Sequence, residues 1–294
     1  MAIWDELFQW PFKCNKMNRL LILVILCAFL KINGQNSVRV FYQLESKSNV
    51  KQDSADLDLY VLDIDIPKKS SKFYNYTYLK NDSVYLSMKK ESDVRGSVNF
   101  DTRKMKYPIF NIGVLKQNAT YEMVQILDGD VFRYLDGKDA KWSILSEKIR
   151  IGDYDCQKAT ATVGGRKWEV FFTVEISLPF GPYKFGGLPG LIVQAKDDSN
   201  SYIFTMVGLE KTNQKDFVPK IFTKGIKTTK EKYYKAFNAY KIDPVKKLRE
   251  NIITYPDGDY MKLAQPLPSD YIKSREAKMK KYLLENDNYI EIKK

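Results

Sequence analysis

The protein has 294 residues, a mass of 34.3 kDa and a formal net charge of +12, and its sequence contains no histidine. The missing histidine excludes Ser-His-Asp and Cys-His relays, imidazole-ligated metal sites and a histidine proton shuttle near neutral pH. Hydrophobic residues make up 44% and aromatic residues 14% of the chain, enough to build a packed core.

The N-terminal region is typical of an export signal. Residues 20–30 are all apolar, Arg19 precedes them, and the small residue Gly34 follows shortly after. A membrane-spanning helix needs about 20 apolar residues, so this shorter run favours a secretory signal peptide over residues 1–34. A buried core helix is the alternative. We therefore expect a periplasmic or cell-envelope location.

The first residues fit a signal peptide poorly, because Asp5 and Glu6 place acidic charge where a positive region is expected. Translation from Met17 would remove this conflict, and we expect Met17 to be the true start. Cys27 follows Leu26 rather than a small residue, so the sequence does not predict a lipoprotein.

A single cysteine, Cys156, remains once residues 1–34 are removed. One cysteine cannot form an internal disulfide, so it is either a buried small apolar residue or a free thiol. Gln157, Ala159 and Ala161 alternate beside it, which favours a buried strand position.

The region 35–210 has the composition of a β-rich domain. Short runs rich in Val, Ile, Tyr and Phe alternate with turn residues, as expected for strands joined by hairpins. Asp128-Gly129-Asp130 and Asp136-Gly137-Lys138 both predict hairpin turns. The strongest period-two pattern extends over 167–177, with Trp168, Val170, Phe172, Val174 and Ile176 on one face. Further strands are expected at 38–44, 57–64, 121–127, 131–135, 141–145 and 202–210.

The region 211–294 is different in pattern and charge. Residues 210–294 hold 20 basic and 12 acidic side chains, whereas residues 35–209 hold 24 and 22. Thr228 and Thr229 precede a helical pattern at 230–241, and Ser269 opens another that continues to about Leu284. The sequence thus predicts a basic helical part packed on the same domain. The fold class expected is β-dominated α+β: a curved antiparallel meander sheet or half-open barrel with C-terminal helices.

The sequence offers no assembled catalytic set and no metal-binding motif. Glu169 and Glu175 are six positions apart on a strand, roughly 20 Å, which is too far for paired-carboxylate glycoside hydrolysis. Asp197 and Asp198 belong to a predicted hairpin turn, where exposed carboxylates serve their own backbone. We expect these acids to be solvated, and we expect neither a cofactor nor a metal ion.

The segment around residues 142–197 resembles the GLPGLI family of exported proteins typical of Bacteroidetes. Its hexapeptide consists of Gly187, Leu188, Pro189, Gly190, Leu191 and Ile192, and Gly181-Pro182 precedes it. The stretch from Ile151 to Ala159 is similar to a second family segment, and Asn288-Tyr289-Ile290-Glu291-Ile292 is similar to its common C-terminal Asn-Pro-Ile-Glu-Leu without the proline. The resemblance implies an exported protein and brings no activity or ligand.

Physically, the hexapeptide favours a structural corner over a ligand loop. Its glycines permit left-handed or closely packed backbone, and Pro189 restricts Leu188. The expectation is a tight corner or bulge at a sheet edge, with a strand beginning at Leu191. No Gly-Lys-Ser/Thr follows, so the sequence predicts no phosphate loop.

Aromatic residues near this corner suggest a binding role. Tyr183, Phe185, Tyr202 and Phe204 cluster around it, and an aromatic cavity in a curved sheet suits a lipid, peptide or glycan ligand. The sequence leaves enzymatic activity open but favours a non-catalytic envelope module that binds or carries an apolar or extended ligand.

Two alternatives stay open. One is a carboxylate-dependent hydrolase of an envelope or extracellular polymer. The other is a surface-interaction protein whose basic C-terminal helices touch an anionic membrane or envelope polymer. Nucleic acid is not expected as a partner of an exported chain.

Overall fold

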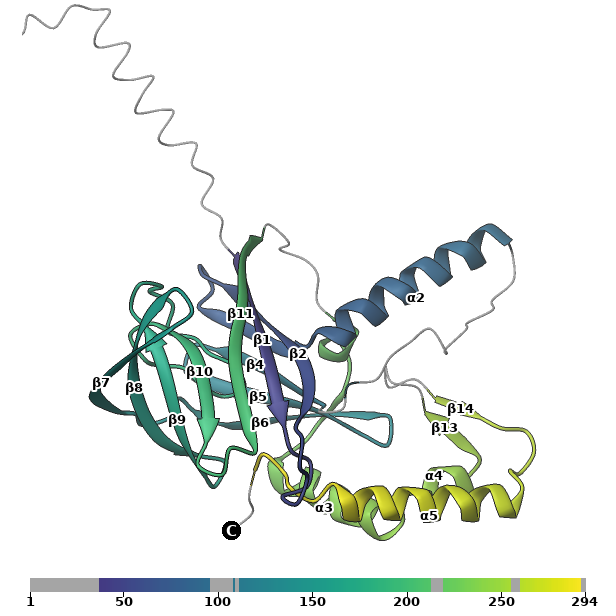
Figure 1. Ribbon diagram of the computed structural model, residues 1–294. Helices are drawn as coiled ribbons and strands as arrows, with labels where there is room; N and C mark the ends of the chain where they lie inside the picture. The colour runs from purple at the N-terminus through teal and green to yellow at the C-terminus, as the bar shows by residue number, and fades with distance from the viewer. Residues whose placement is uncertain (1–36, 96–107, 109–110, 213–218, 255–259, 292–294) are drawn as a thin grey trace, which may run out of the picture. The chain divides into compact units, whose positions relative to one another are not determined.

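One large curved sheet dominates the protein (Figure 1). The computed structural model describes residues 37–95, 108, 111–212, 219–254 and 260–291; the expected signal peptide and the start at Met17 lie outside them. Within these ranges the sheet has twelve strands in the order β12-β6-β5-β4-β3-β2-β1-β11-β10-β9-β8-β7. The strands are β1 (Ser37–Ser46), β2 (Asp56–Asp65), β3 (Ser70–Asn75), β4 (Ile112–Gln117), β5 (Thr120–Leu127), β6 (Asp130–Lys138), β7 (Ser143–Ile151), β8 (Tyr154–Val163), β9 (Arg166–Thr173), β10 (Leu191–Asp197), β11 (Tyr202–Thr212) and β12 (Ile226–Lys227).

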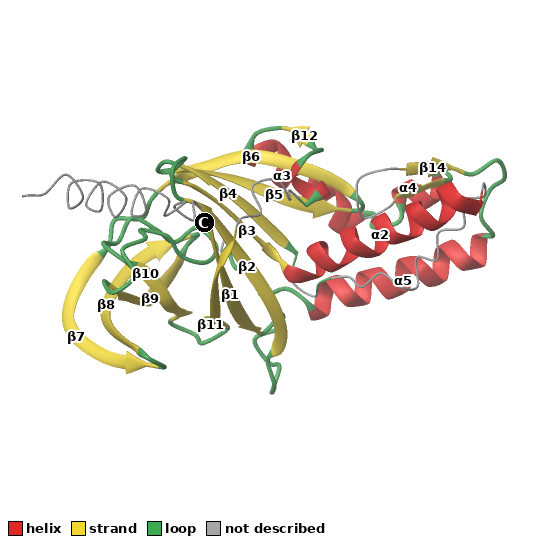
Figure 2. Ribbon diagram, turned by 90° about the horizontal axis from the view of Figure 1, so that it is seen from above, coloured by secondary structure: helices red, strands yellow, loops and turns green. Residues whose placement is uncertain are grey.

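The topology is a double meander. Strands β1 to β6 pair in sequence order, as do β7 to β11, and an antiparallel pair between β1 and β11 joins the two series. Only the short β12 pairs in parallel, with β6, among the strands described. Figure 2 shows the resulting curved sheet, which remains open at both edges. The predicted fold class, a curved antiparallel meander with C-terminal helices, is confirmed.

One of the two predicted hairpin turns is confirmed and the other is wrong. Asp128 and Gly129 have φ angles of 50° and 79° and join β5 to β6, as the primed hairpin turns require. Gly137, with φ of 81°, lies inside β6 instead, where the register against β5 shifts. A glycine with positive φ serves a bulge as well as a turn, so the local signal was ambiguous.

Strand β9 is shorter than predicted. It ends at Thr173, whereas the predicted strand continues to residue 177. Val174, which was predicted to lie on the apolar face of the strand, is 60% exposed. The following chain leaves the sheet and returns at β10 through the hexapeptide corner. Gly187 has φ of 84°, and a Cβ on Gly190 would lie 1.9 Å from the Thr173 carbonyl oxygen. The corner is confirmed, but it leads into β10, an interior strand, rather than a sheet edge.

The main core lies on the face of the sheet that carries Val40, Tyr42 and Trp168, which we call the inner face. The segment between β9 and β10 covers part of this face, with Phe185 and Leu188 buried against it. Tyr233 of helix α3 (Lys230–Ile242) and Ile290 belong to the same core. The C-terminal region therefore completes the core of the β-rich domain.

A second apolar cluster on the outer face is covered by α2 (Tyr76–Arg95) and the 3-10 turn η2 (Lys220–Phe222). Helix α2 was not predicted from the sequence. The side chain of Asn75 accepts a hydrogen bond from the backbone N of Thr77 at 2.9 Å, and residues 76–95 contain neither glycine nor proline. An Asn cap before an uninterrupted stretch was the available signal.

Both predicted C-terminal helices are confirmed. Helix α3 begins after Thr229, as predicted, and α5 extends over Ser269–Glu285. Between them lie the short helix α4 (Lys246–Arg249) and a small hairpin of β13 (Ile252–Thr254) and β14 (Tyr260–Lys262), which the sequence analysis treated as loops. Among the helices described, none combines the length and the apolar composition needed to cross a membrane.

Candidate functional site

A cavity of about 660 Å³ is bordered by the inner face of the sheet, by helices α3 and α5 and by the C-terminal segment 286–291. Nine of the 27 residues that border it are aromatic, and polar groups lie among the rings. We call it the tyrosine cavity after the side chains that border it: Tyr134, Tyr183, Tyr202, Tyr233, Tyr234, Tyr240, Tyr282 and Tyr289.

Helix α3 forms one wall of the tyrosine cavity. The Thr229 hydroxyl caps the helix by accepting a hydrogen bond from the backbone N of Lys232 at 3.3 Å. Tyr233 and Phe237 lie one turn apart and stack, with ring centroids 6.3 Å apart. The Tyr233 ring also stacks on Tyr134 of β6 at 5.1 Å. These contacts fix the aromatic side of the helix against the sheet.

The C-terminal segment closes another side of the cavity. The backbone N of Asn288 donates to the Ser48 carbonyl at 3.0 Å, and its side chain donates to the Lys47 carbonyl at 2.7 Å. The Tyr202 hydroxyl donates to the Asn288 carbonyl, and Ile290 is 5% exposed. The segment is therefore held by both hydrogen bonds and burial.

Arg166 connects this segment to the sheet through a buried ion pair. Its guanidinium lies 2.8 Å from the Asp197 carboxylate, donates to the Tyr289 carbonyl at 2.7 Å and stands 5.1 Å over the Tyr202 ring. The Asp197 side chain is fully buried and also accepts from the Tyr202 backbone N at 2.8 Å. The expectation that Asp197 is solvated is wrong. The hairpin turn is confirmed, but Arg166 draws its carboxylate inward.

A second charged cluster surrounds Glu291. Lys184 and Lys230 each contact both Glu291 and Asp136, and the Tyr183 hydroxyl donates to Glu291 at 2.6 Å. Burial opposes ionisation of Glu291, but the charge and hydrogen bond of Lys184, the Tyr183 hydroxyl and the charge of Lys230 outweigh it. Together they hold the pKa of Glu291 well below its ordinary value. Two carboxylates and two ammonium groups thus neutralise one another.

This cluster bears on the hydrolase alternative. Asp136 and Glu291 are close enough to share both lysine ammonium groups, which is the proximity that paired-carboxylate catalysis requires. Such catalysis also requires one carboxyl group that retains a proton near neutral pH. Glu291, whose pKa is lowered, does not retain one. Glu291 is therefore held in its ionised form, and the ion pairs that it shares with Asp136 join distant parts of the chain.

The four aromatic residues predicted to bind a ligand occupy two different environments. Tyr183 and Tyr202 border the tyrosine cavity. Phe185 and Phe204 are fully buried in the core, where the Phe185 ring lies 4.6 Å from Trp168. A ligand role for Tyr183 and Tyr202 stays a prediction.

Most residues of the cavity's border were not predicted from the sequence. Tyr233, Tyr234 and Tyr240 were recognised only as aromatic positions of a helix, and Tyr282 and Tyr289 were not singled out. Their aromatic density was visible in the sequence. Their convergence depends on packing α3, α5 and the C-terminal segment on the sheet.

Burial or ion pairing accounts for other residues that were singled out from the sequence. Cys156 is buried in β8, as predicted, and burial raises its thiol pKa to about 11. Glu169 lies 2.5 Å from Lys158 and 3.0 Å from Lys196. Within the ranges described, no three Asp, Glu or Cys side chains gather as a metal ion would require.

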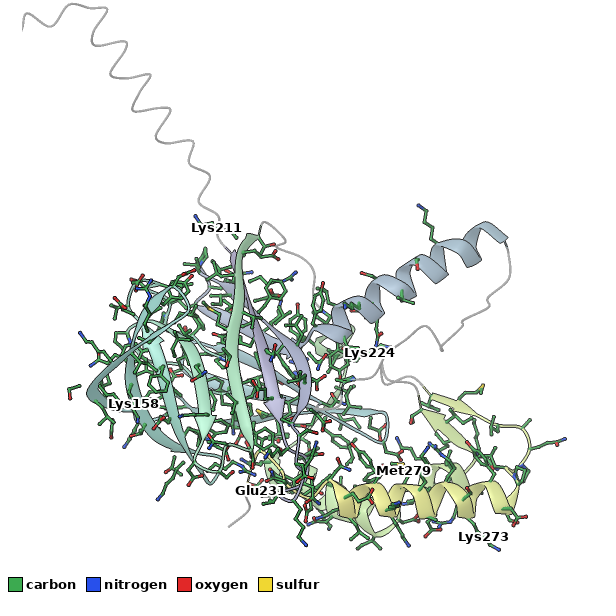
Figure 3. The ribbon with its side chains drawn as sticks, in the orientation of Figure 1. Lys158, Lys211, Lys224, Glu231, Lys273 and Met279 are labelled. Atoms are coloured by element: carbon green, nitrogen blue, oxygen red, sulfur yellow. The ribbon has the colours of Figure 1, made fainter. Side chains whose placement is uncertain are left out.

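The basic residues of α5 are partly paired. Glu276 of α5 lies 2.7 Å from Lys280 of the same helix and 2.5 Å from Arg249 of α4. Lys273 extends from the helix (Figure 3). Tyr271 and Tyr282 of the same helix are both 48% exposed, but only Tyr282 of these two borders the cavity. The helix therefore presents a mixed charged surface and contributes one aromatic ring to the site.

Comparison with solved structures gives weak overall similarity. Two crystal forms of PNGF-II have 14% and 16% identity and a TM-score of 0.45, covering 68% of this chain and 32% of theirs. The chain thus spans about a third of the length of these structures. An uncharacterized conserved protein from Thermus thermophilus has 6% identity and a TM-score of 0.33, covering 71% of this chain and 99% of that one. A LolA superfamily protein from Nitrosomonas europaea has 10% identity and a TM-score of 0.28, covering 65% and 91% respectively.

Comparison of the sequence with curated proteins gives no match. A protein family described as the N-terminal domain of N-glycanase peptide matches residues 67–236. This range begins before β3 and extends into α3, so it includes the hexapeptide corner and part of the tyrosine cavity. Because the match covers more than half of the sequence, the chain belongs to the N-glycanase peptide N-terminal domain family.

Proposed function

We propose that this protein is a non-catalytic binding module that takes an oligosaccharide in the tyrosine cavity. The observation that carries the proposal is the cavity itself, with eight tyrosines around a space of about 660 Å³. Tyrosine rings offer apolar faces to sugar C–H groups, while their hydroxyls and the neighbouring polar groups can hydrogen-bond sugar hydroxyls.

The family description supports a glycan as the ligand class, since it names an N-glycanase. It does not carry the hydrolytic activity over, because the chain spans only about a third of the PNGF-II structures. The carboxylate pair Asp136 and Glu291 is neutralised by two lysines, so a binding role suits this cavity better than hydrolysis.

Export remains part of the proposal. The apolar run at residues 20–30 behind Arg19 supports a signal peptide, and the resemblance of residues 187–192 to the GLPGLI family supports the same compartment. We propose a module of the cell envelope, where the protein meets extracellular or envelope glycans.

Isothermal titration calorimetry with a tetramer of N-acetylglucosamine and with a released N-linked glycan tests the binding proposal. Tyr282→Ala should weaken binding about fivefold to tenfold, because it removes one aromatic face from the cavity. Tyr271→Ala is the matched control, since this ring has the same 48% exposure on the same helix outside the cavity border.

Three results would contradict the proposal. They are an absence of binding by both saccharides, equal effects of the two substitutions, or binding only to vesicles of phosphatidylglycerol. The last result would support the lipid and membrane alternatives instead. Native mass spectrometry of protein purified from its own envelope gives an independent check, because the fraction of protein that carries a co-purifying saccharide mass should be lower in Tyr282→Ala than in Tyr271→Ala.

A further inference from the structure

The turn between β5 and β6 brings an acidic residue, Asp128, to the border of the tyrosine cavity. The backbone carbonyl of Asp128 accepts hydrogen bonds from Lys247 of α4 at 2.9 Å and from the Thr254 hydroxyl of β13 at 2.8 Å. The Asp128 carboxyl group itself has no hydrogen bond or ion pair in the part of the chain that is described, and Asp128 is one of the residues that border the cavity. Helix α4 and strand β13 thus hold the backbone of Asp128, while its carboxyl group is available to a ligand.

This arrangement is costly for folding. Asp128 is half-buried, and its burial raises the carboxyl pKa to about 6 against the charge of Lys247, with Asp130 and Asp243 adding to the increase. Lys247 is itself paired with Asp130 at 2.7 Å. An Asp-Gly sequence suits the primed hairpin turn, but Asn-Gly would serve it equally well. The turn therefore does not explain why a charged side chain is kept here.

Aromatic rings border the same cavity as Asp128, among them Tyr240 and Tyr282. Burial raises the pKa of Tyr240 to about 12, and the charges of Asp128 and Tyr282 add to the increase. The Lys241 ammonium already lies over the rings of Phe237 and Tyr289, at 5.2 and 6.0 Å. Ring faces of this cavity thus accept a cation in this fold, and a carboxylate beside aromatic rings is the usual environment for an ammonium ligand.

We propose that Asp128 binds a protonated amino group of the ligand, so that the tyrosine cavity selects amino-bearing saccharides over their N-acetylated counterparts. This inference rests on the saccharide binding proposed above and adds the chemical class that the site prefers. The ammonium group would form an ion pair with Asp128 and contact the ring faces of Tyr240 and Tyr282. An acetamido group is neutral and bulkier and would leave the carboxylate uncompensated.

Two probes isolate this preference, because tetramers of glucosamine and of N-acetylglucosamine have the same backbone and differ at nitrogen. At pH 7 the glucosamine tetramer should bind about tenfold more tightly, the effect of one charge-assisted hydrogen bond. Asp128→Asn should abolish the difference while retaining the fold, because asparagine also tolerates positive φ. Asp153→Asn is the matched control, since Asp153 is an exposed acid in another hairpin turn, away from the cavity.

Acidification provides a second readout. The ratio of wild-type affinity to Asp128→Asn affinity for the glucosamine tetramer should fall as the pH is lowered from 7 to 5, because Asp128 becomes protonated. The amino groups of the ligand also gain protons over this range, but they do so equally for both proteins. The other charged or titratable groups near this carboxyl group are Lys247, Asp130, Asp243 and Tyr240, and all of them are retained in Asp128→Asn. The pH dependence can therefore be assigned to Asp128.

The outcomes separate this inference from the proposed function. Equal binding of the two tetramers, or a preference that survives Asp128→Asn, would overturn the inference and leave saccharide binding in place. An absence of binding by both tetramers would overturn the two proposals together. A preference that is lost in Asp153→Asn as well would also count against a specific role for Asp128.

Discussion

The Lys230 ammonium lies 2.9 Å from the Glu291 carboxylate and joins helix α3 to the C-terminal segment. The same ammonium lies 2.6 Å from Asp136, so it also connects both to β6. Lys184 repeats these two contacts from the segment that precedes the hexapeptide corner. Four parts of the chain that are distant in sequence are therefore held by one neutralised cluster, and this cluster lies beside the tyrosine cavity.

Removing the charge of Glu291 should destabilise the protein strongly. Glu291→Gln leaves the buried Lys184 and the half-buried Lys230 with only Asp136, and we expect a loss of about 3 kcal/mol in the free energy of unfolding. Urea denaturation measures the loss. Glu285→Gln is the control, because Glu285 is exposed and makes only a 3.7 Å contact with Lys281. Similar unfolding free energies for the two variants would contradict this account of the cluster.

Glu291 should also make stability depend on acid pH. Its folded-state pKa is lowered from the ordinary value of 4.5, so its contribution is present above pH 4.5 and is lost as the pH falls towards the folded-state value. Wild type should lose stability relative to Glu291→Gln between pH 5 and pH 3. A constant difference over this range, measured by thermal unfolding, would show that Glu291 is not the titrating group.

The opposite sign is expected for Asp128. Its folded-state pKa is raised from 3.8 to about 6, so the folded state is favoured by protonation, and this benefit is lost as the pH rises through 6. Asp128→Asn should therefore stabilise the protein by about 1–2 kcal/mol at pH 7 and by little at pH 4. Unfolding midpoints at the two pH values measure this. A destabilised variant at pH 7 would show that the carboxylate supports the fold.

Arg166 should control the attachment of the C-terminal segment. Arg166→Lys keeps the charge beside Asp197 but cannot reach Asn288 and Tyr289 at the same time. We expect hydrogen exchange at residues 288–290 to increase at least about tenfold, because local opening becomes cheaper by about 1.4 kcal/mol or more. Arg150→Lys, at an exposed position, should leave exchange in this segment unchanged.

The hexapeptide corner should not tolerate a side chain at Gly190. Gly190→Ala places a Cβ 1.9 Å from the Thr173 carbonyl oxygen, and we expect a cost of about 3 kcal/mol or a failure to fold. Gly152→Ala is the control. Gly152 has positive φ but no atom within 4 Å of an added Cβ, so its cost should be about 1 kcal/mol. Equal effects would contradict the role of close packing at Gly190, which has no positive φ.

Local signals predicted most of the elements. Alternating apolar residues located most of the strands but not β3, β4 or β12. Thr229 marked the start of α3, and the glycines and proline of the hexapeptide indicated a corner. Errors arose where one signal has two physical solutions. Gly137 supports a bulge and not a turn, and Val174 continues an alternating pattern beyond the end of β9.

The sequence by itself determined the β-rich fold class, the two main C-terminal helices and the chemistry excluded by the absence of histidine, because these depend on local periodicity and composition. Only the tertiary structure decided which charges are neutralised and which ring faces meet. Asp197 is buried because Arg166 reaches it from a neighbouring hairpin, and Asp128 borders the tyrosine cavity because α4 and β13 hold its backbone. Both environments arise from contacts between distant segments, which local sequence patterns do not encode.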